Sequence, residues 1–146
     1  MFPTILIADD YEDNRELLRL MLMADGYQTR EASNGRECVM MAQSDPPDLI
    51  LIDISMPVLD GWGALSELRA DERTRDIPCV ALTAFSDSDR TRALDAGFDA
   101  YLTKPFRGKD LSETINRMLG EKSRARDSQP GGYGALGSRE KAKSDV

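Results

Sequence analysis

"ILIADDYEDN" (Ile5–Asn14) joins a short apolar run to two adjacent aspartates. Like charges that lie side by side repel each other, and burying an unpaired carboxylate costs several kcal/mol. Asp9 and Asp10 must therefore either face water or hold a cation. The pattern of an apolar run that ends in a charged or hydroxyl side chain returns along the chain, and it decides the fold.

Five short β-prone segments alternate with segments of helical periodicity. The strands are predicted at 4–8, 27–31, 48–52, 79–83 and 100–103, and the helices at 14–25, 35–44, 62–71, 87–96 and 108–119. Such alternation predicts an α/β fold with a parallel sheet and helices on both of its faces. Segments 5–8 and 49–52 are apolar throughout, as is typical of central strands, whereas the polar 27–31 predicts an edge strand.

Capping residues indicate where some of these helices begin and end. Asp13 with Glu16 resembles a capping box for the first helix, and Asn34 with Glu37 gives the start of the second. Three glycines are predicted to terminate helices: Gly26, Gly97 and Gly120.

Length and composition limit the possible functions. The 146 residues suggest one domain at 1–120, followed by a Gly-, Ser- and charge-rich flexible tail or linker stub at 121–146. A net charge of −7 argues against direct nucleic-acid binding, and the lack of histidine argues against zinc, copper and His-dependent catalysis. No apolar run is long enough to span a membrane and no signal peptide is recognisable, so we expect a cytoplasmic protein.

Polar side chains end or directly follow four of the predicted strands: Asp9 and Asp10, then Asp53, then Thr83, and finally Lys104. The carboxyl ends of parallel strands meet at one edge of a sheet, so these groups should share a crevice. Carboxylates without nitrogen or sulfur ligands suit Mg²⁺, with Mn²⁺ as an alternative. Lys104 and Thr83 would neutralise a phosphoryl group, and Asp53 is the candidate nucleophile for an acyl phosphate.

Each residue also has a structural explanation when it is taken alone. An aspartate after a strand often forms a turn or caps a helix, Thr83 suits a β-strand, and Lys104 suits a solvated surface. Their joint occurrence at successive strand ends favours the functional interpretation.

The segments "ILIADD", "DLILIDISMPVLDGW", "VALTA" and "AYLTKPF" resemble the signatures of response-regulator receiver domains of two-component signalling. The resemblance covers residues 4 to about 120, with the segments in the family's order. It implies a flavodoxin-like, doubly wound (βα)5 fold whose five-stranded parallel sheet has the order 2-1-3-4-5.

The resemblance also implies roles for individual residues. Asp53 corresponds to the phosphoacceptor and Lys104 to the phosphate-binding lysine. Asp10 corresponds to a direct Mg²⁺ ligand and Asp9 to one that acts largely through water. Asp53 itself and the backbone carbonyl of Ser55 complete the implied metal site.

Other positions resemble the family's switch. Thr83 corresponds to the switch hydroxyl, Ala84 to a backbone N–H donor for a phosphoryl oxygen, and Tyr101 to the switch aromatic on the fifth strand. The Lys104–Pro105 bond is where the family usually has a cis peptide. Because Ser55 and Phe85 are poorly suited to orient an attacking water, we expect a phospho form that lasts minutes or more.

The partners implied are a histidine kinase or histidine phosphotransfer protein upstream, docking near Asn14 and Pro57. A protein target downstream would bind the face made by helix 4, strand 5 and helix 5. The chain would be a monomer or a weak phosphorylation-dependent dimer, with no nucleic-acid or membrane partner. Its chemistry would be limited to accepting and losing its own phosphoryl group, which is not that of an enzyme.

Alternatives remain open from the sequence. The chain is either a stand-alone receiver or a receiver cut from a larger hybrid kinase or response regulator, and it could be a non-phosphorylated scaffold. A carboxylate-nucleophile phosphatase is disfavoured because Ile54 and Ser55 follow Asp53 without the second acid of a D-x-D pair. A flavin site is disfavoured because Asp9 and Asp10 would repel its phosphate.

Overall fold

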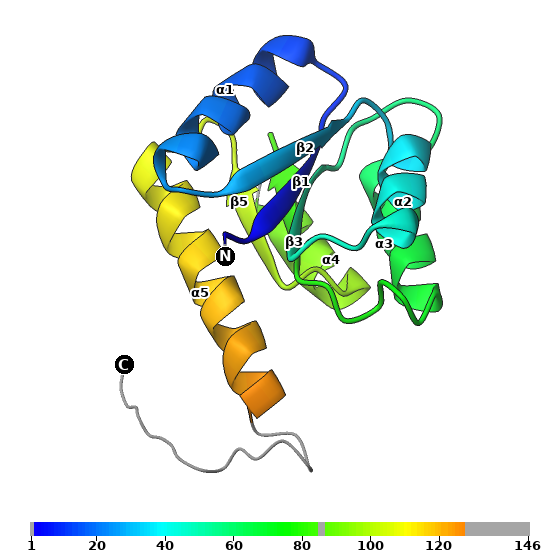
Figure 1. The fold of residues 1–146 in the computed structure, drawn as a ribbon. Helices are drawn as coiled ribbons and strands as arrows, with labels where there is room; N and C mark the ends of the chain where they lie inside the picture. Colours follow the sequence, from blue (N-terminus) through cyan, green and yellow to red (C-terminus); the bar gives the residue numbers. More distant parts are fainter. Residues whose placement is uncertain (1, 85–86, 128–146) are drawn as a thin grey trace.

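A computed structural model describes residues 2–84 and 87–127, with the side chains of 87–89 and 121–127 left aside. Strands and helices alternate along this part of the chain (Figure 1). In chain order they are β1 (Thr4–Ala8), α1 (Glu12–Ala24), β2 (Gln28–Ala32), α2 (Gly35–Ser44), β3 (Leu49–Asp53), α3 (Gly61–Ala70), β4 (Cys79–Thr83), α4 (Asp87–Ala96), β5 (Ala100–Thr103) and α5 (Gly108–Asp127).

The strands form one parallel sheet of order β2-β1-β3-β4-β5, which confirms the predicted fold. Helices α1 and α5 cover one face, and α2, α3 and α4 cover the other (Figure 1). Successive residues of β1 face opposite sides, so Ile5 packs under α1 and α5 while Leu6 packs under the other three helices. Both β1 and β3 are buried on both faces, and the polar β2 lies at the edge, as predicted.

Two of the predicted helix ends are confirmed by backbone geometry. Gly26 follows the α1 C-cap with φ +92°, and Gly97 follows α4 with φ +115°, both in the region that glycine adopts readily. The start of α2 is also confirmed, because the Asn34 side chain accepts a hydrogen bond from the Glu37 N–H, and Glu37 reaches back to the Ser33 N–H.

The predicted capping box of α1 is wrong. The helix begins at Glu12, and its N-cap, Tyr11, makes no side-chain capping bond. Asp13 therefore lies inside the first turn, where its negative charge interacts favourably with the helix dipole instead of capping the backbone.

The predicted end of α5 at Gly120 is also wrong, because the helix continues to Asp127. A glycine inside a helix costs only about 1 kcal/mol relative to alanine. The following residues, "EKSRARD", contain good helix formers and no proline, so the helix continues. Residues 128–146 of the predicted tail lie outside the described part of the chain. Among the described helices, none is both long and apolar enough to cross a bilayer.

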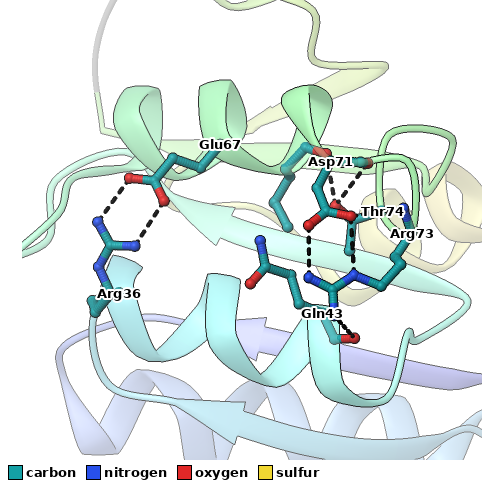
Figure 2. Close-up of polar contacts among 7 residues, drawn as sticks. Arg36, Gln43, Glu67, Asp71, Arg73 and Thr74 are labelled. Atoms are coloured by element: carbon teal, nitrogen blue, oxygen red, sulfur yellow. Dashed lines mark hydrogen bonds and ion pairs between the residues drawn. The ribbon is translucent and has the colours of Figure 1, made fainter.

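Polar contacts join α2 to α3 and fix the turn that leads into β4 (Figure 2). Arg36 makes two bonds of 2.7 Å to the carboxylate of Glu67, one from each terminal nitrogen. Arg73 binds both oxygens of Asp71, and the buried Thr74 hydroxyl donates to the Leu68 carbonyl at 2.7 Å. These bonds hold α3 and its following turn in place beside the sheet.

Helix α4 is attached differently, through two arginines that lie over aromatic rings. The guanidinium of Arg92 lies 4.1 Å from the Trp62 ring centroid, and that of Arg90 lies 5.2 Å from the Tyr101 ring centroid. Trp62 in turn meets Phe98 edge to face. Among the described side chains of α4, Ala93 is the one that is buried.

Replacing Asn34 by alanine is expected to lower the free energy of unfolding by about 1 kcal/mol, because the Glu37 N–H loses its capping acceptor. Urea denaturation would measure the change. Asn34→Asp keeps the acceptor and adds a charge that favours the helix start, so it should remain as stable as the wild type. Equal losses in both variants would contradict the capping explanation.

Candidate functional site

Three carboxylates meet at the carboxyl edge of the central strands. Asp53 ends β3, while Asp9 and Asp10 directly follow β1. Ala8 is paired with Ile52 in the parallel register, which brings the next residues of the two strands side by side. One carboxylate oxygen from each of Asp9, Asp10 and Asp53 lies within 4.8 Å of the other two.

The three carboxylates differ in exposure. Asp9 is fully buried at 0% and Asp53 is 7% exposed, whereas Asp10 is exposed. The Ser55 N–H donates to Asp53 Oδ1 at 2.9 Å, and the Tyr11 N–H donates to Asp9 Oδ1 at 2.9 Å. Each buried carboxylate is thus held by a backbone donor two residues further along the chain.

Lys104 brings a positive charge to the two buried carboxylates. Its Nζ lies 3.0 Å from Asp53 Oδ2 and 3.3 Å from Asp9 Oδ2. The residue follows β5, and its N–H donates to the Thr83 carbonyl at 2.7 Å. The Lys104–Pro105 peptide is cis, as the resemblance implied.

Burial and charge act against each other in this cluster. Burial raises the pKa of Asp53, although the Ser55 N–H and the Lys104 ammonium oppose the shift, and Asp9 adds to it. Burial on its own would lower the pKa of Lys104, but the bonds and charges of Asp53 and Asp9 outweigh it and raise the pKa. Lys104 therefore stays protonated beside the two carboxylates, and at Asp53 its attraction outweighs the repulsion from Asp9 but does not fully offset the effect of burial.

The predicted switch residues occupy neighbouring strand positions. Thr83 ends β4 with 3% exposure, and the preceding Leu82 is paired with Asp53. Ala84 follows it and is exposed. Tyr101 lies on β5 opposite Ala81, half-buried against the core under α2, α3 and α4. The structure thus brings Thr83 to the carboxylate edge and leaves Tyr101 on the α4 side, while Phe85 lies outside the described residues.

A cavity of about 340 Å³ opens beside the acidic edge, between α1 and the loop after β5. Its lining residues are Asp9, Asn14, Leu17, Leu18, Met21, Lys104, Pro105 and Phe106. Of the predicted docking residues, Asn14 is therefore at the site, whereas Pro57 is exposed on the β3–α3 loop.

Two residues that bear on the site had not been singled out from the sequence. Arg15 of α1 donates from Nη1 to the Asp9 carbonyl at 2.8 Å. Gly61 donates from its N–H to the Ile54 carbonyl at 2.8 Å, and an added Cβ would lie 2.7 Å from the Asp53 carbonyl oxygen. No local sequence pattern connects Arg15 with the main chain of Asp9, or Gly61 with the main chain at the end of β3.

The donor set fits a hard divalent cation. The cluster offers carboxylate oxygens and no nitrogen or sulfur, which favours Mg²⁺ over zinc or copper. Lys104 supplies one positive charge against three negative ones, so a cation would relieve the remaining repulsion.

Comparison with known proteins agrees with this arrangement. Residues 5–116 match a family model described as the response regulator receiver domain. The polar-differentiation response regulator DivK of Brucella ovis is 37% identical over 122 residues, covering 83% of this chain and 99% of DivK. The probable transcriptional regulator ycf27 of Guillardia theta is 38% identical and is covered over 47% of its length. The chain thus spans about half the length of the first curated relatives that it matches.

Solved structures of receiver domains and response regulators are also similar to this chain. The receiver domain of the sensor histidine kinase PA1611 from Pseudomonas aeruginosa, with a magnesium ion coordinated in its active site cleft, has a TM-score of 0.77 and 36% identity, covering 82% of this chain and 99% of that one. The chemotaxis response regulator CheY4 of Vibrio cholerae has a TM-score of 0.76 and 28% identity, covering 81% and 99%. Sequence, fold and acidic edge lead to one conclusion: the chain belongs to the response regulator receiver domain family of two-component signalling.

Proposed function

We propose that the chain is a phosphorylation-activated switch in which Asp53 accepts a phosphoryl group from a histidine kinase or histidine phosphotransfer protein. The observation that carries this proposal is the setting of the Asp53 carboxylate. It lies at the edge of the sheet, bound by the Lys104 ammonium and the Ser55 N–H, within reach of two further carboxylates.

In the transfer step, an oxygen of Asp53 attacks phosphorus while the bond from phosphorus to the donor's nitrogen breaks, and the leaving imidazole takes up a proton. The Ser55 N–H fixes one Asp53 oxygen, so the carboxylate cannot rotate freely. Lys104, which already pairs with Asp53 and Asp9, can follow the negative charge onto the transferred group. Thr83 and the Ala84 N–H, at the end of β4, are proposed to bind its oxygens.

Asp9, Asp10, Asp53 and the Ser55 carbonyl are the residues that would hold Mg²⁺, with Mn²⁺ as the alternative ion. When bound, the cation supplies positive charge that offsets both the carboxylate repulsion and the charge of the incoming phosphoryl group. The magnesium ion in the related PA1611 receiver domain supports this assignment.

Output is proposed to pass through the α4–β5–α5 face. A doubly charged group on Asp53 would draw Thr83 inward, and Tyr101, now under Arg90, would take a new position. Recognition of a downstream protein would follow from that change, and the chain acts as a switch whose chemistry is confined to its own phosphorylation. The apolar cavity beside Asp9 and Lys104 is the proposed docking place of the phosphodonor.

The proposed function predicts that Asp53→Asn abolishes phosphorylation, because an amide lacks the nucleophilic oxygen. Intact mass would be measured after incubation with acetyl phosphate, with and without Mg²⁺. The wild type should gain one phosphoryl group only when Mg²⁺ is present. Asp95→Asn removes an exposed α4 carboxylate and serves as the matched control, which should behave as the wild type.

An unchanged mass for the wild type under every condition would overturn the proposal. It would favour the alternative of a receiver-fold scaffold that binds its partner without phosphorylation. Phosphorylation that persists in Asp53→Asn would instead assign the acceptor role to another residue.

A further inference from the structure

The turn between β1 and α1 carries two of the three clustered carboxylates, and it lacks the side-chain cap that α2 and α3 have. Within this turn the Tyr11 N–H binds the Asp9 carboxylate, which also accepts Lys104. The bond from the Tyr11 N–H therefore depends on the Asp9 carboxylate, which is itself part of the acidic site. A cation that competes for the Asp9 carboxylate would weaken the bond from the Tyr11 N–H. The turn would then need another contact to keep its conformation.

Arg15 provides a contact that does not depend on the carboxylates. Its Nη1 donates to the main-chain carbonyl of Asp9 at 2.8 Å, and its Nε donates to Glu31 Oε1 on β2 at 3.1 Å. The side chain is only 15% exposed, which limits competition from water. The bond remains available whatever the Asp9 carboxylate binds, because its acceptor is a backbone oxygen.

The two main-chain groups of Asp9 are thereby both tied to the edge strand. The Asp9 N–H donates to the Ala32 carbonyl of β2 at 3.1 Å, and the carbonyl is tied through Arg15 to Glu31, also on β2. Asp10 follows directly and has no such burial, since its side chain is exposed. The position of its carboxylate relative to Asp53 therefore depends on how firmly the residue before it is held.

From this geometry we infer that Arg15 is a positioning residue, which fixes the β1–α1 turn so that Asp9 and Asp10 keep the spacing that a divalent cation requires. The inference rests on the proposed function in taking the acidic cluster as the metal site. Residues that orient metal ligands through a hydrogen bond commonly contribute about tenfold or more to metal affinity. We therefore expect about a tenfold loss of Mg²⁺ affinity in Arg15→Ala.

Arg19 offers a matched control within the same helix. It lies one turn further along α1 and pairs with the same Glu31 at 3.5 Å and with Glu16 at 4.0 Å. Within the described part of the chain, the polar contacts of Arg19 are with Glu16, Met23 and Glu31 and not with Asp9. Arg19→Ala removes one positive charge close to Arg15 on α1 but leaves the bond from Arg15 to the Asp9 carbonyl intact. It therefore separates the positioning effect of Arg15 from a general electrostatic effect.

The experiment measures Mg²⁺ binding to the unphosphorylated full chain by isothermal titration calorimetry, alongside thermal unfolding without metal. Wild type, Arg15→Ala, Arg15→Lys, Arg19→Ala and Asp10→Asn are compared. We expect weaker binding in Arg15→Ala and near-normal binding in Arg19→Ala. Arg15→Lys should give an intermediate value, because it keeps a charged donor group but loses the forked guanidinium. With acetyl phosphate, the half-saturating Mg²⁺ concentration should rise in Arg15→Ala while the rate at saturating Mg²⁺ stays unchanged.

Three results would overturn the inference: wild-type affinity in Arg15→Ala, equal losses in the Arg15 and Arg19 variants, or a lower saturated rate with an unchanged Mg²⁺ requirement. If Arg15→Ala does not fold, Arg15→Lys against Arg19→Lys decides by the same criterion. Failure of the proposed metal site would give a different result. In that case the wild type would bind Mg²⁺ no better than Asp10→Asn does.

Discussion

Lys104→Met is expected to lower the free energy of unfolding by about 2 kcal/mol in metal-free solution and to slow Asp53 phosphorylation by about a hundredfold. The Lys104 Nζ lies 3.0 Å from Asp53 and 3.3 Å from Asp9, so its removal leaves two buried carboxylates without their positive partner. The loss should be smaller than for a fully buried pair, because the lysine side chain is 27% exposed and partly screened by water.

The presence of Mg²⁺ should change how much stability the Lys104→Met variant loses. The lysine and the cation would both neutralise the same carboxylates, so the cation should stabilise the methionine variant more than it stabilises the wild type. Thermal unfolding with and without Mg²⁺ measures the difference. Lys109→Met, which removes an exposed lysine of α5, is the control and should change neither quantity. An equal Mg²⁺ effect in wild type and Lys104→Met would contradict the shared role of lysine and cation.

Gly61→Ala is expected to lower the free energy of unfolding by about 3 kcal/mol, because its Cβ has no space. An ideal Cβ would lie 2.6 Å from Ile54 Cα and 2.7 Å from the Asp53 carbonyl oxygen. Both are backbone atoms, so either α3 or the end of β3 must shift. A shift of β3 would also displace the Asp53 carboxylate, and phosphorylation should slow together with the loss of stability.

Gly63→Ala is the matched control two residues further along α3. Its added Cβ would meet Leu59 Cδ1 at 2.5 Å, the far end of a side chain that can rotate away. Alanine is also favoured over glycine within a helix by about 1 kcal/mol, so the net change should be small. Denaturant midpoints for the two variants decide the question, and similar losses in both would show that crowding against the β3 backbone is not the cause.

Much of the fold could be predicted from local sequence. The continuous apolar runs of β1 and β3, the polar β2 and the positive-φ glycines Gly26 and Gly97 each depend on neighbouring residues alone. The α1 start and the α5 end could not be predicted in this way. Asp13 and Glu16 have the spacing of a capping box, but the helix has already begun at Glu12, so Asp13 is not at the N-cap. Gly120 resembles a stop but lies within a sequence that favours continuation.

The acidic site was predictable from the topology, because the carboxyl ends of parallel strands bring Asp9, Asp10 and Asp53 to one edge. Its supporting contacts were not. Arg15 meets the main chain of Asp9, and Gly61 lies against the main chain at the end of β3, so neither contact follows from residue type or spacing. Contacts to backbone atoms leave no complementary side chain in the sequence by which they could be recognised.

The weak attachment of α4 affects the relative populations of conformations that differ in the position of this helix. Helices α2 and α3 each bury several residues, whereas the described side chains of α4 bury Ala93 and otherwise rely on Arg90 and Arg92 over aromatic rings. Such cation–π contacts contribute only about 0.5–1 kcal/mol at exposed sites. Because about 1.4 kcal/mol changes the ratio of two states tenfold, losing one ring contact would change the occupancy of alternative α4 positions severalfold. Compared with α2 and α3 on the same face of the sheet, the described side chains of α4 provide fewer buried contacts, so a smaller free energy suffices to change the position of this helix.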